Sequence, residues 1–155
     1  MDIPRFLDLA VDLETQLSKV YEALAERCGE PPISAQLKAL ANAEINHANI
    51  IRQGRRYYDE LPDLFAGITM NEIELAAELE EARIFHASVS HGEISFPDGL
   101  RKLLDLEKRF EKIHIEVSVR FTDSSTKRLF NSLAHSDRSQ VEVLKGLIES
   151  FGENG

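Results

Sequence analysis

Hydrophobic residues recur at steps of three and four along most of the chain, which is the spacing of one face of an α-helix. The clearest run predicts a first helix through apolar positions at Phe6, Ala10, Leu13, Leu17, Val20, Tyr21 and Leu24. Gly29 and Pro31 predict where this helix ends. Similar runs predict helices over about residues 34–58, 69–92, 98–121 and 126–151. The pattern therefore predicts an all-α fold.

Capping residues indicate where two of these helices begin. Ser34 precedes the second apolar run and is predicted to be its N-cap. Thr69 is followed three residues later by Glu72, which is the capping-box pattern and predicts the start of a shorter third helix. The fourth helix is predicted to begin near Asp98, directly after Pro97.

The chain contains an internal repeat at an offset of 93 residues, as in the pair Glu14 and Glu107. Between residues 7–51 and 100–144, eight aligned pairs are identical, whereas chance gives about 3. The identical pairs are Leu7/Leu100, Asp12/Asp105, Leu13/Leu106, Glu14/Glu107, Lys19/Lys112, Arg27/Arg120, Leu40/Leu133 and Ala41/Ala134.

The repeat predicts two copies of one helical hairpin. Hairpin 1 covers about residues 4–58, a crossover with the short helix covers 59–97, and hairpin 2 covers about 98–151. Two amphipathic hairpins bury their apolar faces most completely against each other, so a single four-helix-bundle domain over residues 1–155 is expected.

Each of the four main helices carries one acidic residue on its apolar face: Glu14, Glu44, Glu107 and Asp137. A buried carboxylate without a partner destabilises a fold by several kcal/mol, and four converging carboxylates repel each other. A bound cation is the simplest way to neutralise them. Glu44 and His47 form Glu-x-x-His, which puts a carboxylate and an imidazole on one face, one turn apart.

In these acidic residues and the Glu-x-x-His motif, the chain resembles the rubrerythrin branch of the ferritin-like superfamily. The resemblance covers a little over half the chain, in the stretches LAVDLETQLSKVYEALAER, LKALANAEINHANII, LLDLEKRFEKIH and LFNSLAHSDRSQVEVL. It implies a ferritin-like four-helix bundle with a non-haem di-iron site, whose relatives handle peroxide, oxygen or iron. The iron ligands that it implies are Glu14, Glu44, His47, Glu107 and Asp137.

The second half departs from the family pattern. Asp137 stands where the family has Glu, Gln140 where it has His, and His114 where it often has Tyr. The single cysteine excludes the four-cysteine rubredoxin module, so a separate electron-donor protein is expected for redox chemistry. Whether Gln140, His114 or a crossover glutamate completes the second half of the site stays open, as does whether the site is di-iron or incomplete.

Other readings of the same residues remain. An acid on an apolar stripe can be a solvated edge residue, and His47 can be a core histidine bonded to a backbone carbonyl. The four acids can also persist as hydrogen-bonded pairs in a degenerate bundle that works without metal as a binding or assembly module. His114 and Tyr21 are each placed to hydrogen bond to a site carboxylate, and His135 is predicted to face outward.

The composition indicates which kinds of binding partner and cellular setting to expect. A net charge of −9 disfavours nucleic-acid binding, because an acidic chain repels phosphate groups. No apolar run is long enough to span a membrane, and the N-terminus reads as a helix start without the features of a signal peptide. One cysteine, Cys28, predicts a reducing, cytoplasmic setting. A homodimer is left open.

Overall fold

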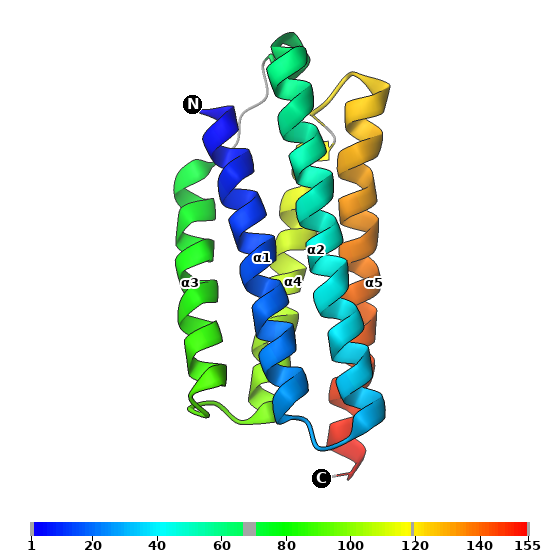
Figure 1. The fold of residues 1–155 in the computed structure, drawn as a ribbon. Coiled ribbons are helices and arrows are strands. Elements are labelled where there is room, and N and C mark those ends of the chain that lie inside the picture. Colours follow the sequence, from blue (N-terminus) through cyan, green and yellow to red (C-terminus); the bar gives the residue numbers. More distant parts are fainter. Residues whose placement is uncertain (1, 67–70, 119, 155) are drawn as a thin grey trace.

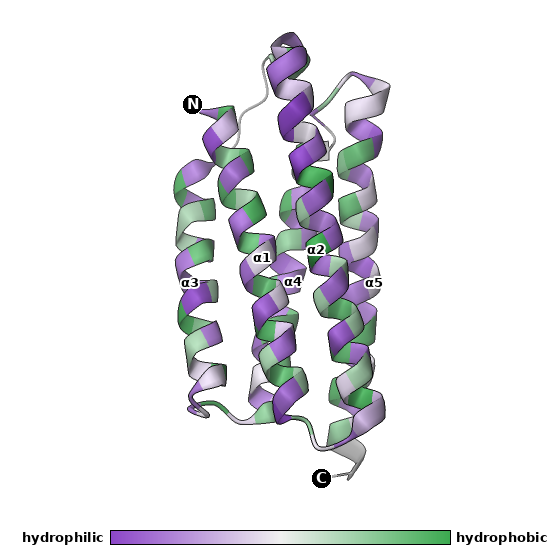
Figure 2. Cartoon of the chain, in the orientation of Figure 1, coloured by the Kyte–Doolittle hydropathy of each residue, from purple (hydrophilic) through white to green (hydrophobic). Residues whose placement is uncertain are grey.

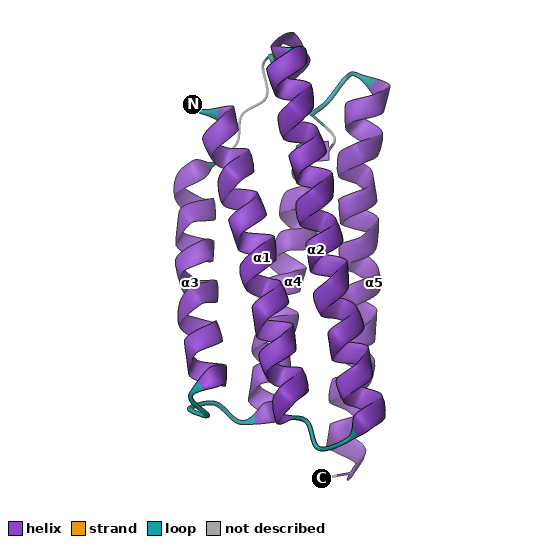
Figure 3. Cartoon of the chain, viewed as in Figure 1, coloured by secondary structure: helices purple, strands orange, loops and turns teal. Residues whose placement is uncertain are grey.

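The computed structural model describes residues 2–66, 71–118 and 120–154, and most of these residues are helical (Figure 3). No strand occurs within these ranges. The all-α prediction is confirmed. The helices are α1 (Ile3–Arg27), α2 (Pro31–Glu60), the 3₁₀ helix η1 (Pro62–Phe65), α3 (Glu72–Ser90), α4 (Phe96–Ser118) and α5 (Ser124–Asn154).

The α-helices lie side by side with their long axes nearly aligned (Figure 1). Along the chain, α1, α3 and α5 run in one direction and α2 and α4 run in the other. The pairs α1 and α2, and α4 and α5, pack along each other, and α2 also packs on α5. Helix α3 lies against α1 and carries the chain back to the end of the molecule where α4 begins (Figure 1).

The helix starts differ from the predicted ones for local reasons. Helix α2 begins at Pro31, and Ser34 lies inside its first turn, where its hydroxyl donates to a backbone carbonyl of α1. The predicted N-cap role of Ser34 is therefore wrong. The predicted N-cap Thr69 lies outside the described residues. Helix α3 instead has Asn71 as its N-cap, whose side chain accepts a hydrogen bond from the backbone N–H of Glu74.

Repeat-related apolar residues occupy the same interior. Leu7 and its repeat partner Leu100 are both fully buried, and Leu13 and Leu106 are buried with them. Buried side chains from all five α-helices and η1 form one hydrophobic cluster. The 3.6-residue periodicity of the sequence thus predicts correctly which side of these helices faces inward.

Every α-helix carries both hydrophilic and hydrophobic residues along its length (Figure 2). Among the described residues, no helix is long and apolar enough to cross a membrane.

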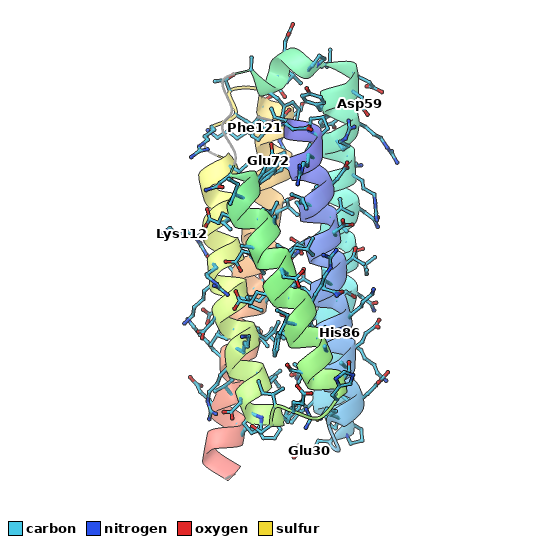
Figure 4. All side chains as sticks on the ribbon, turned by 90° about the vertical axis from the view of Figure 1, so that its left-hand side faces the viewer. Glu30, Asp59, Glu72, His86, Lys112 and Phe121 are labelled. Atoms are coloured by element: carbon cyan, nitrogen blue, oxygen red, sulfur yellow. The ribbon has the colours of Figure 1, made fainter. Side chains whose placement is uncertain are left out.

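An aromatic cluster closes one end of the molecule, near Phe121 and the end of α2 (Figure 4). The ring of Phe65 in η1 makes edge-to-face contacts with Tyr58 and Phe121, with centroids 5.4 and 5.2 Å apart. The ring of Phe121 in turn stacks on Phe130 of α5, with a centroid distance of 4.9 Å. Through this cluster, the start of the crossover packs against both hairpins.

Truncating the centre of that cluster is expected to destabilise the fold. Phe65 is 2% exposed, so Phe65→Ala should lower the free energy of unfolding by about 3–5 kcal/mol, through lost burial and the cavity left behind. Leu61→Ala is a matched control, because Leu61 is 56% exposed, and should change stability by less than about 0.5 kcal/mol. Urea unfolding of both variants measures the difference. Equal, small effects would show that the aromatic cluster does not stabilise this end.

Candidate metal centre

The four acids predicted from the sequence all lie in the interior, one from each of α1, α2, α4 and α5. The exposed fractions are 3% for Glu14, 0% for Glu44, 1% for Glu107 and 1% for Asp137, and His47 is 2% exposed. The reading of these acids as solvated edge residues is therefore wrong. Carboxyl groups are rarely buried to this extent unless they are paired or bind an ion.

His47 lies at the centre of the group. Its Nδ1 atom is 3.4 Å from Glu44 Oε2, 3.5 Å from Glu14 Oε2 and 3.7 Å from Asp137 Oδ1. Its other ring nitrogen, Nε2, is 2.6 Å from the hydroxyl of Ser136 on α5. The serine holds the ring so that Nδ1 faces three carboxyl groups. Ser136 was not a candidate from the sequence, and its position next to Asp137 was the only available signal.

Two of these inward-facing atoms have no ordinary partner. In the part of the chain that the structure describes, neither His47 Nδ1 nor Glu44 Oε2 has a hydrogen-bond partner in good geometry. The distances of 3.4–3.7 Å around Nδ1 exceed a good N–H···O hydrogen bond. They match the spacing between ligand atoms that each lie about 2.1 Å from one tetrahedral ion, which is about 3.4 Å.

The donor set therefore fits a metal ion. One ligand atom from each of Glu14, Glu44 and His47 can be chosen so that all lie within 4.8 Å of one another. Carboxylate oxygen and imidazole nitrogen are donors that bind iron, zinc and related divalent ions. The buried Glu/Glu/His cluster can thus hold a metal.

Two further side chains orient the acids. The hydroxyl of Tyr21 donates a hydrogen bond to Glu107 Oε1 at 3.0 Å, as the sequence predicted for this tyrosine. The side-chain amide of Gln140 donates to Glu44 Oε1 at 3.0 Å and leaves Oε2 directed toward His47. The sequence leaves open whether Gln140 completes the second half of the site as a ligand. The structure instead shows it holding a ligand candidate in place.

His114 of α4 also reaches the group. Its Nδ1 atom makes a short hydrogen bond with Asp137 Oδ2, and its Nε2 atom lies 3.6 Å from Glu14 Oε1. The predicted contact between His114 and a site carboxylate is confirmed. The interior thus contains two imidazoles among four carboxyl groups.

Burial and mutual repulsion raise the pKa of three of these acids, Glu14, Glu44 and Glu107, and so favour their protonated forms in the metal-free fold. Burial, with the nearby charge of Glu14, raises the pKa of Glu44 to about 8. The pKa values of Glu14 and Glu107 also lie well above the usual range, chiefly because of burial. Burial lowers the pKa of His47, but the carboxylates of Glu44 and Asp137 outweigh it and raise that pKa overall.

The remaining candidates lie elsewhere. His135 is exposed, as predicted. Within the described part of the crossover, Glu78 is the buried acid, and it pairs with Arg109 Nη1 at 3.3 Å. His86 lies at the far end of α3 from Glu72 (Figure 4).

Comparisons of the chain with protein-family models, with curated proteins and with solved structures found no match.

Neutralising one buried acid is expected to stabilise the metal-free protein. A carboxyl whose folded-state pKa of about 8 exceeds its ordinary value of 4.5 stabilises the fold most below pH 4.5, and this stability is lost as the pH rises to about 8. Glu44→Gln, whose amide oxygen can still accept from Gln140, should therefore raise the free energy of unfolding at pH 8 by about 1–4 kcal/mol.

Thermal unfolding with a chelator present, at pH 5 and pH 8, checks this expectation. The gain should shrink at pH 5, where the carboxyl is protonated in the folded protein and partly so in the unfolded chain. Glu26→Gln, at an exposed position on α1, should change nothing at either pH. A Glu44→Gln variant less stable than the parent at pH 8 would show that the carboxyl group itself holds the helices together.

Proposed function

We propose that this chain is a ferritin-like four-helix bundle of the rubrerythrin type, which binds non-haem iron and reacts with peroxide or dioxygen. In this proposal α1, α2, α4 and α5 form the bundle, and α3 forms the crossover between its hairpins. The internal repeat, the antiparallel packing within each hairpin and the return of the chain through α3 support it.

One observation carries the metal-binding part of the proposal. The fully buried Nδ1 atom of His47 lies 3.4–3.7 Å from three carboxylate oxygens that come from three different helices. Burying so many acidic groups around an unpartnered imidazole nitrogen lowers the stability of the fold. A cation in the space between these groups would offset that loss, which favours metal binding.

The residues around the ion have distinct roles. Glu44, His47 and Glu14 supply the ligand atoms, with Asp137 and Glu107 completing the acidic shell. Ser136 fixes the ring of His47, and Gln140 and Tyr21 each fix the oxygen of one acid. Partners of this kind typically raise metal affinity about 10–100-fold.

Iron is the metal that the rubrerythrin resemblance implies, and the oxygen and imidazole donors suit it. When bound, ferrous iron supplies electrons to peroxide or dioxygen. These 155 residues contain one cysteine, too few for a rubredoxin iron site within them, so in this proposal the electrons that restore the ferrous state come from outside this bundle, as from a separate donor protein.

A second candidate function is a metal-free bundle that serves as a binding or assembly module. The hydrogen bonds from Gln140 to Glu44 and between His114 and Asp137 favour it, because they satisfy part of the acidic cluster without an ion. Metal content distinguishes the two functions.

Anaerobic titration with ferrous iron tests the main proposal. The parent should bind one iron tightly per chain. His47→Ala removes the nitrogen donor and should weaken this binding at least about 100-fold, since loss of an orienting partner alone weakens binding about 10–100-fold. His135→Ala removes an exposed histidine and should bind as the parent does.

Adding peroxide to the iron-loaded protein should then oxidise the iron, seen as a rise in near-ultraviolet absorbance, in the parent and in His135→Ala. A parent that binds no iron would leave the metal-free module as the better account. Iron bound equally well by His47→Ala would mean that the iron lies outside this cluster.

A further inference from the structure

We propose that an enclosed hydrophobic cavity beside the metal position is a binding site for dioxygen, and that it favours dioxygen over peroxide as the oxidant of the bound iron. This inference rests on the proposed function and deepens it, because that function leaves the choice between the two oxidants open. The place of the cavity, its size and the chemistry of its walls support the inference.

The cavity lies where all five α-helices meet. Its walls include Leu13 of α1, Ile51 of α2, Leu75 of α3, Phe110 of α4 and Phe130 of α5. Glu14 also lines the cavity, and its Oε2 atom lies 3.5 Å from His47 Nδ1. A molecule in the cavity is therefore next to the metal position, with Glu14 between them.

The cavity has room for one small molecule. About 20 Å³ of it is open to the centre of a water-sized molecule, whereas a single water needs about 10–15 Å³ by the same measure. A diatomic molecule fits this space, and an organic substrate of many atoms does not. Most wall residues are buried, and the partly exposed ones are Ile113 and His114. The most direct way in from solvent therefore runs along this side of α4.

The walls favour an apolar occupant. Among the described residues that line the cavity, Glu14 and His114 are polar and the others are hydrophobic. The two polar groups lie next to each other, with Glu14 Oε1 3.6 Å from His114 Nε2. Most of the wall thus offers no hydrogen-bond partner, and enclosed cavities of this kind bind apolar molecules and gases.

This lining distinguishes the two oxidants. Peroxide has two hydroxyl groups, and a hydroxyl group that leaves water without finding a hydrogen-bond partner loses free energy. Dioxygen has no hydrogen-bond donor and is weakly hydrated, so it enters a hydrophobic space at little cost. The cavity therefore concentrates dioxygen beside the metal position and does not concentrate peroxide.

Methyl NMR of the metal-free protein under dioxygen pressure tests the binding step, because paramagnetic dioxygen speeds the relaxation of nearby methyl groups. Leu13 and Ile113 line the cavity, and their methyl groups should relax faster than those of Leu24 and Leu37. The latter two residues are fully buried elsewhere in the core and serve as internal controls. This measurement needs neither iron nor a substitution.

Filling the cavity tests its link to the iron. Ala10 lines the cavity, so Ala10→Leu should place a larger side chain in it and abolish the difference in methyl relaxation. In the iron-loaded protein, the same variant should lower the rate of iron oxidation by dioxygen, relative to that by peroxide, at least about 10-fold, as for a blocked hydrophobic pocket. Ala87→Leu, at an exposed position on α3, should match the parent in both measurements.

The two rates are compared per electron. Each dioxygen takes one electron from each of four ferrous ions, together with four protons from solvent, and forms two waters. Each peroxide takes two electrons and two protons and also forms two waters. If Ala10→Leu fails to fold, Ala10→Val makes the smaller change in the same direction, and the measurement on the parent stands without either variant.

The outcomes separate the two proposals. A parent that binds no iron overturns the proposed function, and with it the role of dioxygen as an oxidant. Methyl groups of Leu13 and Ile113 that relax no faster than those of Leu24 overturn this inference alone, whatever the iron content. A folded Ala10→Leu variant with an unchanged ratio of the two rates also overturns it, because dioxygen then reaches the iron by another route.

Discussion

Four carboxyl groups are buried between helices that otherwise pack through hydrophobic side chains. The rest of the structure depends on this constraint. Glu14, Glu44, Glu107 and Asp137 are each at most 3% exposed. Four ionised acids at this density are incompatible with a stable fold, because each loses its hydration and repels the others. In the metal-free protein, retained protons and the two imidazoles offset the charge. A bound cation offsets it without them.

The side chains around the acids follow from this constraint. Tyr21 donates to one carboxyl group and Gln140 to another, and Ser136 holds His47 by its outer nitrogen. Each contact fixes the orientation of a side chain that could otherwise rotate to form a different hydrogen bond. The unpartnered atoms that remain, Glu44 Oε2 and His47 Nδ1, face the same space. Unpartnered buried polar atoms lower the stability of a fold, and a cost of this kind is common at functional sites.

The two halves of the repeat differ at two pairs of corresponding positions near the acids. The first hairpin has an imidazole at His47 and a phenol at Tyr21, whereas the second has an amide at Gln140 and an imidazole at His114. Each hairpin thus contributes one histidine to the interior, but from a different helix of the pair. The consequence is an interior with two unlike sides, one next to Ser136 and one next to a hydrophobic cavity.

The sequence by itself determined the number of α-helices and which face of each is buried, because helical periodicity depends only on residue spacing. It also determined that the four acids face inward, and that Tyr21 and His114 lie near them. Only the tertiary structure decided the pairings, such as Gln140 with Glu44 and Ser136 with His47. It also decided that α2 begins after Glu30, with the predicted cap Ser34 inside its first turn, and that Asn71 caps α3. A helical wheel gives the direction of a side chain but not its height relative to the neighbouring helix, and packing between helices sets that height.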